Sequence, residues 1–366
     1  MCGNSGDKNR TEPYICVFGI AMERGKRIIK KDVYYEFTKG KSMTELRFPR
    51  KYVTSSGAVC TIIEGDSREE LRAYNGQVDL IVTSPPYADA RSRHYDSVHP
   101  NDFADWFMTF HEPFFDALKP TGSLVINIKD KVVDGVRHRY VWHIIERLSE
   151  NGWFCIDDYI CHKPNPMPGY WPTRLRGGWE YCFHLAKSTH PFFDADAVRK
   201  PVGDWVESRL KNLGNNDLSR HNSANASGFG RNISKWVGKN TVLPPNVLSL
   251  PLVGKNKGHP AVFPVDLPMF FIKLLSPPNG LVVDPFGGSG TTGIAALVAE
   301  RNCVLIDNNH EYCCAAHNRL IAEAGASSAT EVLQETLYGR NEMVKHLVVK
   351  ETNTGTDDQK RGSTPS

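Results

Sequence analysis

The segment Ser84-Pro85-Pro86-Tyr87 combines a hydroxyl group, two rigid residues and an aromatic ring. Because proline fixes φ and lacks a backbone donor, neither a helix nor a central strand can continue through this pair, and the proline carbonyls stay free. A hydroxyl, free carbonyls and a ring face can together hold a planar base by its exocyclic amino group. The alternative is an ordinary Pro-Pro turn between a strand and a helix.

A second set of residues forms a glycine-rich turn, Pro285-Phe286-Gly287-Gly288-Ser289-Gly290. An apolar run ending on Asp284 precedes it, and Thr291 begins a helix after it. A further apolar run ends on Asp307, about twenty residues beyond the glycines, where a carboxylate can accept both hydroxyls of a ribose. The pattern predicts a nucleotide-type cofactor site. Dehydrogenases, flavoproteins and methyltransferases all use such a turn, but here it is not G-x-G-x-x-G.

Apolar runs of strand length alternate with segments of helical periodicity along the middle of the chain. This alternation predicts an α/β fold, a doubly wound and mostly parallel sheet with helices on both faces. We expect seven strands, at residues 58–63, 78–82, 123–128, 153–161, 180–186, 281–284 and 303–306. We expect helices at residues 68–74, 102–118, 140–150, 265–275, 291–298 and 311–324.

The candidate ligand groups Asp66, Ser84, Asp284 and Asp307 each lie at or just beyond the carboxyl end of an expected strand. Open α/β sheets bind their ligands at this edge. We therefore expect the two motifs to converge on one site.

Composition excludes several classes of protein. No apolar run approaches the roughly 18 residues of a membrane span, and the N-terminus lacks the apolar segment of a signal peptide, so we expect a cytoplasmic protein. The nine cysteines include no C-x-x-C pair, which indicates neither a disulfide framework nor a zinc site. We expect reduced, mostly buried cysteines. The net charge of +3 is too small to identify a polyanionic partner.

Charge and pattern divide the chain into five segments. Residues 1–57 form a basic, partly disordered extension, residues 58–186 and 259–329 hold the two halves of the sheet, and residues 330–366 form a largely disordered tail. Residues 187–258 form a basic lobe in which eleven Lys and Arg oppose five Asp and Glu. Because hydrophobic periodicity also fades there, the lobe favours nucleic-acid contact over a plain solvated surface.

Two loops are further candidates for substrate contact. Residues 88–100 contain Arg91, Arg93 and His94, and residues 163–172 are rich in proline and aromatic side chains. The second loop should be stiff and should present rings and amides. Plain surface loops remain the alternative.

In this order, the two motifs resemble those of the S-adenosylmethionine-dependent DNA amino-methyltransferases, in the permuted (β) class where the catalytic strand precedes the cofactor strand. Thr83-Ser84-Pro85-Pro86-Tyr87 matches the catalytic motif, and Asp284-Pro285-Phe286-Gly287-Gly288-Ser289-Gly290-Thr291-Thr292 matches the cofactor motif. His259-Pro260 and the helix after it resemble the element that closes the methionine side of the cofactor site. The likeness covers roughly residues 58–324, and the basic lobe would be the target-recognition region.

The resemblance implies a cofactor role for each matching residue. Asp307 would hold the ribose hydroxyls of S-adenosylmethionine, and Asp66 would accept from its adenine amine. The remaining expected cofactor contacts are His259, Pro260, Asp284, Phe286, Gly288, Gly290 and Thr291. No metal is implied.

The catalytic loop would act on the amine of the target base. Hydrogen bonds from that amine to Ser84 Oγ and the Pro85 carbonyl would favour a pyramidal nitrogen, in line with the sulfonium methyl group. Pro86 stiffens the loop, and Tyr87 would stack on a base flipped out of the duplex.

Ser84 as the first residue of this motif is typical of N4-cytosine enzymes, whereas adenine enzymes usually carry Asp there. We therefore expect cytosine N4 as the acceptor, with adenine N6 as the alternative. A catalytically silent DNA-binding protein and a nicotinamide-dependent oxidoreductase also stay open.

The resemblance implies double-stranded DNA as the partner and no membrane, in a monomer or dimer associated with the nucleoid through DNA. It also implies a restriction-modification setting, in which a cognate restriction endonuclease acts on the same site without forming a stable complex.

Overall fold

The computed structural model describes residues 17–23, 26–33, 46–88, 98–166, 168–170, 172–203, 239–251, 263–325 and 327–328. The predicted tail at residues 330–366 lies outside them, as do Arg91, Arg93 and His94. His259-Pro260 and much of the basic lobe lie outside them too.

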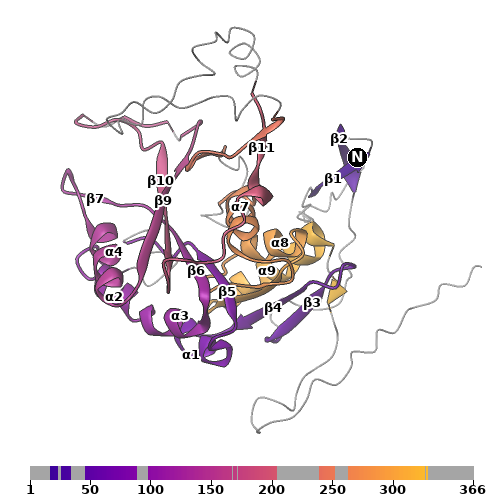
Figure 1. The fold of residues 1–366 in the computed structure, drawn as a ribbon, viewed down its shortest axis with the longest axis horizontal. Coiled ribbons are helices and arrows are strands. Elements are labelled where there is room, and N and C mark those ends of the chain that lie inside the picture. The colour runs from indigo at the N-terminus through magenta and orange to yellow at the C-terminus, as the bar shows by residue number, and fades with distance from the viewer. Residues whose placement is uncertain are drawn as a thin grey trace, which may run out of the picture. The chain divides into compact units, whose positions relative to one another are not determined.

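The centre of the protein is a mixed sheet whose strand order is β13-β9-β10-β6-β5-β14-β15-β4-β3-β16 (Figure 1). All seven expected strands lie side by side in it, which confirms the doubly wound, mostly parallel α/β fold. They are β4 (Val59–Glu64), β5 (Val78–Thr83), β6 (Leu118–Ile128), β9 (Phe154–His162), β10 (Trp179–Ala186), β14 (Leu281–Asp284) and β15 (Asn302–Asp307).

The expected number of seven strands was too low, because three short strands extend the sheet. β13 (Val247–Ser249) pairs with β9, while β3 (Arg50–Val53) and β16 (Ser327–Ser328) continue beyond β4. None of the three contains an apolar run long enough to stand out in the sequence. β3 shows that pairing within the sheet begins before residue 58, where the sequence had suggested the core to begin.

The direction in which successive strands are added to the sheet reverses between β5 and β14. These two strands are parallel neighbours, yet about 200 residues separate them in the chain, with Leu80 opposite Val282. β6, which follows β5, lies on one side of this pair, and β15, which follows β14, lies on the other. A crevice for ligands opens outside the carboxyl ends of strands at such a switch point. The catalytic and cofactor motifs follow these two strands directly.

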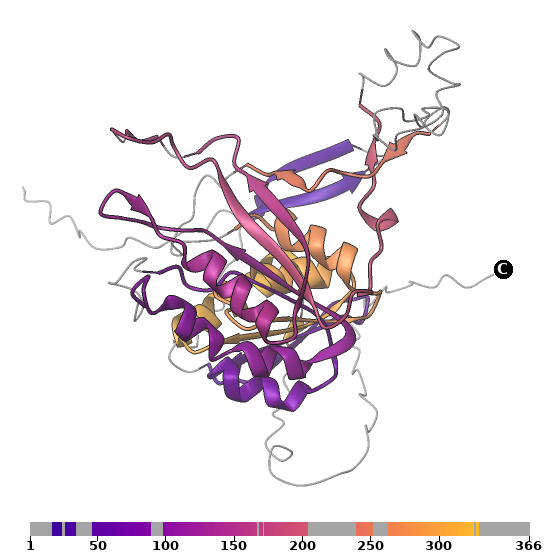
Figure 2. The same ribbon diagram turned by 60° about the vertical axis from the view of Figure 1, so that its left-hand side comes forward.

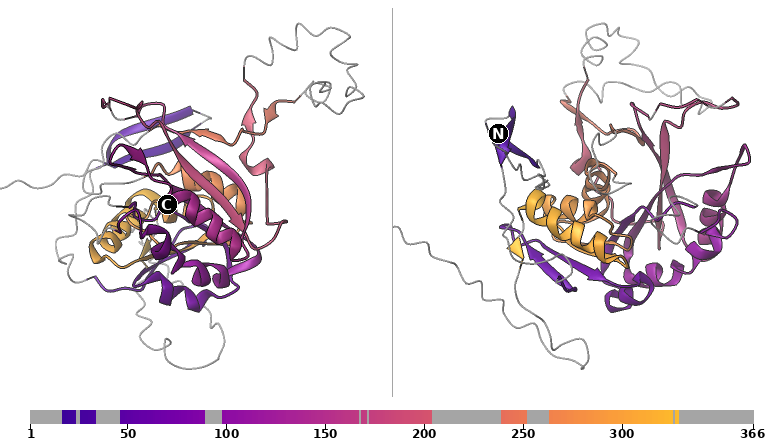
Figure 3. Two further views of the ribbon diagram at one scale, coloured as in Figure 1. Left: turned by 90° about the vertical axis from the view of Figure 1, so that its left-hand side faces the viewer. Right: turned by 180° about the vertical axis from the view of Figure 1, so that it is seen from behind.

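Helices cover both faces of the sheet (Figures 2 and 3). On one face, α7 (Asp266–Leu275), α8 (Thr291–Val298) and α9 (His310–Ala324) bury their apolar side chains in one cluster. On the other, α2 (Phe103–Met108), α3 (His111–Ala117) and α4 (Tyr140–Glu150) build a second cluster. Strand β5 contributes Leu80 and Val82 to the first cluster and Ile81 to the second.

Two sequence predictions in this region were wrong in detail. The single helix expected at residues 102–118 is split into α2 and α3, because Pro113 has no backbone N–H to continue the helix from the turn before it. β6 begins at Leu118, before the expected start at residue 123, and Pro120 lies within it. The register between β5 and β6 shifts near Pro120, and β10 pairs with β6 only from Ser123 onward. The missing N–H of Pro120 therefore interrupts no regular ladder of hydrogen bonds.

The remaining elements of the described residues are α1, two 3-10 turns and three pairs of strands. α1 (Ser67–Glu70) continues into a 3-10 turn, Leu71–Tyr74. In the basic lobe a 3-10 turn at Asp196–Val198 precedes β11 (Lys200–Pro201), which pairs with β12 (Thr241–Val242). Two hairpins, β1 (Val17–Glu23) with β2 (Lys26–Val33) and β7 (Val132–Val133) with β8 (Val136–Arg137), complete the list.

Six of the seven cysteines that the structure describes are buried, as expected. Within the same residues, no helix is long and apolar enough to cross a bilayer.

Candidate active site

The catalytic loop begins where the buried strand β5 ends at Thr83. Pro85 is buried, whereas Ser84, Pro86 and Tyr87 are partly exposed. The Tyr87 hydroxyl donates to Asn127 Oδ1 at 3.5 Å, a long contact that orients the ring without holding it tightly. Burial raises the pKa of Tyr87 well above its ordinary value, although a hydrogen bond from Ser84 opposes the shift. The ring is therefore neutral and serves as a packing surface.

Asn127 is a site residue that the sequence reasoning missed. It lies near the carboxyl end of β6 and is buried, and its amide donates to the Tyr181 carbonyl at 3.1 Å. This bond directs its oxygen toward Tyr87. The only signal in the sequence was one amide within an otherwise apolar strand.

Asp284 connects the catalytic strand to the cofactor turn. Its side chain is 1% exposed, and its two oxygens accept from Thr83 Oγ1 and Thr292 Oγ1, each at 2.6 Å. The backbone N–H of Phe286 adds a third bond at 3.1 Å. Burial raises the pKa of Asp284, and these three hydrogen bonds oppose the shift. These three hydrogen bonds connect the end of β5 to the glycine-rich turn and the start of α8. The direct cofactor contact expected of Asp284 stays a prediction.

The glycine-rich turn passes close to neighbouring elements. Gly290 has φ +81°, and a Cβ there would lie 2.9 Å from the Cβ of Ala316 in α9. Gly288 has φ 49° and donates its N–H to Asp307 Oδ2 at 2.8 Å. Arg319 of α9 also holds the turn, because it donates to the carbonyl and the hydroxyl of Ser289 at 3.0 and 2.9 Å. The turn is therefore fixed around Asp307 by its own chain.

Asp307 lies at the carboxyl end of β15, as the sequence predicted. Its Oδ1 accepts the N–H of Asn309 at 2.9 Å, and Oδ2 accepts that of Gly288. Burial raises the pKa of Asp307 to about 6, and these two hydrogen bonds oppose the shift. Because an ionised carboxylate offers about four lone-pair directions, two remain for the hydroxyls of a ribose.

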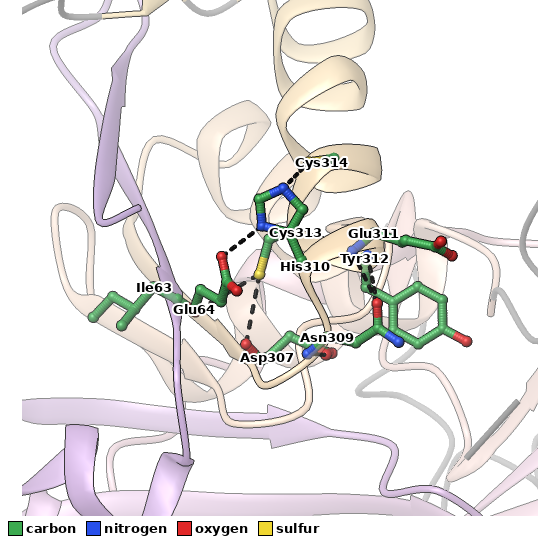
Figure 4. Close-up of polar contacts among 9 residues, drawn as sticks. All are labelled: Ile63, Glu64, Asp307, Asn309, His310, Glu311, Tyr312, Cys313 and Cys314. Atoms are coloured by element: carbon green, nitrogen blue, oxygen red, sulfur yellow. Dashed lines mark hydrogen bonds and ion pairs between the residues drawn. The ribbon is translucent and has the colours of Figure 1, made fainter. Parts of the chain in front are cut away.

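The turn between β15 and α9 is further fixed by the contacts in Figure 4. Asn309 caps α9, His310 Nδ1 lies 2.7 Å from Glu64 Oε2, and the Cys313 thiol lies 3.5 Å from the Asp307 carbonyl. The Cys314 thiol contacts the other ring nitrogen of His310 at 3.4 Å. Burial raises the pKa of both thiols, which therefore stay protonated and act as packing groups.

Asp66 follows β4 and caps α1. Both of its oxygens accept from the Arg68 guanidinium, and this pairing lowers the pKa of the carboxyl. Arg68 lies over the ring of Phe110, at 5.3 Å from the centroid. Phe110 in turn meets Phe286 of the glycine-rich turn, with ring centroids 5.0 Å apart. The edge of the expected adenine site thus consists of the Asp66–Arg68 ion pair and the rings of Phe110 and Phe286.

The described residues therefore bring the two motifs to neighbouring strand ends, joined through Asp284. Thr291 is buried at the start of α8, where its hydroxyl accepts from Arg319 at 2.9 Å. His259 and Pro260 lie outside the described residues, so their predicted contacts stay predictions.

This fold is that of an α/β methyltransferase, and the predicted catalytic loop and the predicted cofactor turn follow adjacent strands. A family model for DNA methylases matches residues 78–318. The Type II methyltransferase M.PvuII of Proteus hauseri is 30% identical over 323 residues, covering 81% of this chain and 94% of the relative. The Type II methyltransferase M.SmaI of Serratia marcescens is 27% identical, covering 72% and 91%.

A solved structure gives the same result. The structure titled PvuII DNA methyltransferase (cytosine-N4-specific) matches with a TM-score of 0.55 at 27% identity, covering 75% of this chain and 90% of that one. The chain belongs to the DNA methylase family, and it is a DNA methyltransferase.

Proposed function

We propose that this enzyme transfers a methyl group from S-adenosylmethionine to the exocyclic N4 amine of cytosine in double-stranded DNA. The observation that carries the proposal is the arrangement at the switch point. Ser84 and the Pro85 carbonyl follow β5, the glycine-rich turn follows β14, and the buried Asp284 joins the two through Thr83 and Thr292. A base amine held by the first motif would thus face a methyl donor held by the second.

The residues of the cofactor half fit S-adenosylmethionine. Asp307 retains free lone pairs for a ribose, and Gly288 brings the backbone close to it. At the neighbouring strand end, Arg68 holds the Asp66 carboxylate beside the expected position of the adenine. When bound, the cofactor supplies an electrophilic methyl group on a sulfonium. Phe286, packed against Phe110, would border the methionine portion.

The catalytic loop would make the amine a better nucleophile. An exocyclic amine is poorly nucleophilic because its lone pair is delocalised into the ring. Acceptors at Ser84 Oγ and the Pro85 carbonyl favour a pyramidal nitrogen whose lone pair points toward the methyl group. Tyr87, oriented by Asn127, would stack on the extruded base. Catalysis would then rest on positioning and hydrogen bonding, without a covalent intermediate.

Two observations favour cytosine over adenine. Ser84 presents a neutral hydroxyl at the position where the adenine enzymes of the resembled family usually carry a carboxylate. The matching solved structure is titled cytosine-N4-specific. N6-adenine methylation by the same loop is the alternative.

The relatives M.PvuII and M.SmaI are named Type II methyltransferases. We therefore also propose that this enzyme marks sites that a cognate restriction endonuclease would otherwise cut. The two proteins would act on the same sequence without a stable complex.

The proposal is tested by measuring transfer of a labelled methyl group into unmethylated genomic DNA, alongside equilibrium binding of the labelled cofactor. We expect the Ser84→Ala variant to bind the cofactor as the wild type does and to transfer methyl groups far more slowly. Asp307→Asn should instead weaken cofactor binding. Wild-type transfer by Ser84→Ala would show that the loop has been assigned the wrong role.

A further inference from the structure

Lys129 lies directly beyond the carboxyl end of β6, the strand next to the catalytic strand β5. Asn127, two residues earlier, holds Tyr87 of the catalytic loop. Because side chains two residues apart in a strand point to the same face, Lys129 follows Asn127 on the side that faces this loop. Its ammonium group is thus placed on the substrate side of the site.

A second contact ties Lys129 to the catalytic loop. The hydroxyl of Tyr140, a buried residue at the start of α4, donates to the Lys129 carbonyl, and the backbone of Ala88 also hydrogen-bonds this hydroxyl. Ala88 directly follows Tyr87. One buried hydroxyl group therefore connects the end of the catalytic loop to the backbone of Lys129, which fixes their relative position.

The Lys129 ammonium donates to no acceptor among the residues that the structure describes, since none of them forms a hydrogen bond or an ion pair with it. The lysine is nevertheless partly buried, and burial lowers its pKa. Gly177, in the connection between β9 and β10, makes room for it, because a Cβ at Gly177 would lie only 2.6 Å from Nζ. Its three N–H donors are thus confined, and no described residue accepts from them.

The acidic side chain opposite Lys129 in the sheet is already engaged. By the pairing of Tyr181 with Ile128, Glu180 continues the register opposite Lys129, and its charge acts on both Lys129 and Tyr87. However, Glu180 forms an ion pair with Lys163, and these two side chains are only 12% and 19% exposed. Asp130, another acidic side chain whose charge acts on Lys129, forms an ion pair with Arg137. Lys129 and Lys163 therefore share the Glu180 carboxylate beside the predicted catalytic loop, which leaves one positive charge for an incoming oxygen.

We propose that Lys129 donates a hydrogen bond to an oxygen of the target nucleotide, either the O2 carbonyl of the extruded cytosine or the adjacent phosphate. This inference rests on the proposed function, because it requires the target nucleotide to enter the catalytic loop. If the acceptor is O2, Lys129 also discriminates between bases, since adenine carries a C–H group where cytosine carries this oxygen.

The test begins with the wild-type enzyme and genomic DNA, in which sequencing of the methylated positions identifies the recognition site. Failure at this stage, with no methylated cytosine, would contradict the proposed function and leave no substrate for Lys129. Duplexes carrying the site are then made with cytosine, with 2-thiocytosine at the target, or with a neutral methylphosphonate beside it. Methylation rates are measured for the wild type, Lys129→Met and Lys129→Arg.

We expect Lys129→Met to lower kcat/KM on the normal duplex by on the order of 10- to 100-fold, the usual effect of losing a hydrogen bond from a charged donor. Cofactor affinity should not change, and Lys129→Arg should restore part of the rate. On the duplex that lacks the true acceptor, the kcat/KM of the wild type should fall to that of Lys129→Met on the normal duplex. The kcat/KM of Lys129→Met should fall little further on this duplex. A loss limited to 2-thiocytosine identifies O2, and a loss limited to the methylphosphonate identifies the phosphate.

The matched control is Lys273→Met, which removes an exposed lysine from α7. It should leave the rate on all three duplexes unchanged relative to the wild type. The inference is overturned if Lys129→Met retains the wild-type rate. It is also overturned if Lys129→Met lowers the rate on both modified duplexes by the same factor as on the normal duplex.

Discussion

Replacing Thr83 by valine tests whether Asp284 couples the two halves of the site. Valine keeps the shape of threonine but removes the hydroxyl that donates to Asp284 Oδ1 at 2.6 Å. Because Asp284 is fully buried, nothing replaces the lost donor. A lost hydrogen bond to a buried charged group costs about 1.5–3 kcal/mol, so we expect Thr83→Val to unfold at lower urea concentration with a loss of about 2 kcal/mol at neutral pH.

The sign of the pH dependence follows from the same contacts. The pKa of Asp284 is raised in the folded protein, so its ionised form reduces stability as the pH rises through that value. Loss of the Thr83 donor raises this pKa further. The difference between variant and wild type should therefore be largest at neutral pH and smaller in acid, where a protonated carboxyl needs fewer donors.

The assay combines urea unfolding at several pH values with cofactor binding and the methylation rate. Thr83→Ser keeps the hydroxyl and should stay near the wild type. Thr121→Val removes an exposed hydroxyl near the start of β6 and should have no effect. Because Thr83 and Thr292 share one carboxylate, Thr83→Val and Thr292→Val should be non-additive by about 0.5–3 kcal/mol. Full additivity, or a Thr83→Val protein as stable as the wild type at neutral pH, would refute the coupling.

Three further predictions concern individual contacts. Since burial raises the pKa of Asp307 to about 6, the affinity of the wild type for the cofactor, measured by equilibrium dialysis, should weaken as the pH falls below that value. Asp307→Asn should bind the cofactor weakly at every pH. A wild-type affinity that does not change with pH would contradict the ribose assignment. Tyr87→Phe keeps the ring and loses only a 3.5 Å contact, so its methylation rate should fall by less than about tenfold. Tyr87→Ala removes the ring, and its methylation rate should fall far more. Equal losses of rate in the two variants would exclude stacking. Arg68→Gln removes the guanidinium that holds the Asp66 carboxylate in place and should therefore raise the KM for the cofactor with kcat unchanged. A fall in kcat alone would argue against a cofactor role for this pair.

The sequence predicted the strands at the centre of the sheet well because they are apolar runs that are largely buried on both faces. β5 is an example, since all six of its residues are buried. The edge strands could not be predicted in the same way. β13 and β16 contain three and two residues, and their pairing depends on neighbours distant in the chain.

The candidate site was predicted from residues that stand at strand ends, such as Ser84 and Asp307. What the sequence could not give was the connections between them. The bond from Thr83 to Asp284 joins residues 201 positions apart. The roles of Asn127 and Lys129 depend on how β6 lies beside β5. No local pattern reports such contacts, because they arise only when the sheet assembles.

The central claim is tested most directly by identifying the methylated nucleoside. The purified protein is incubated with labelled S-adenosylmethionine and unmethylated genomic DNA, which is then digested and analysed by mass spectrometry. We predict N4-methylcytosine as the labelled product. N6-methyladenine would contradict the argument from the Ser84 hydroxyl while retaining the fold and cofactor, and the absence of any methylated nucleoside, in protein that binds the cofactor, would contradict the proposed DNA substrate.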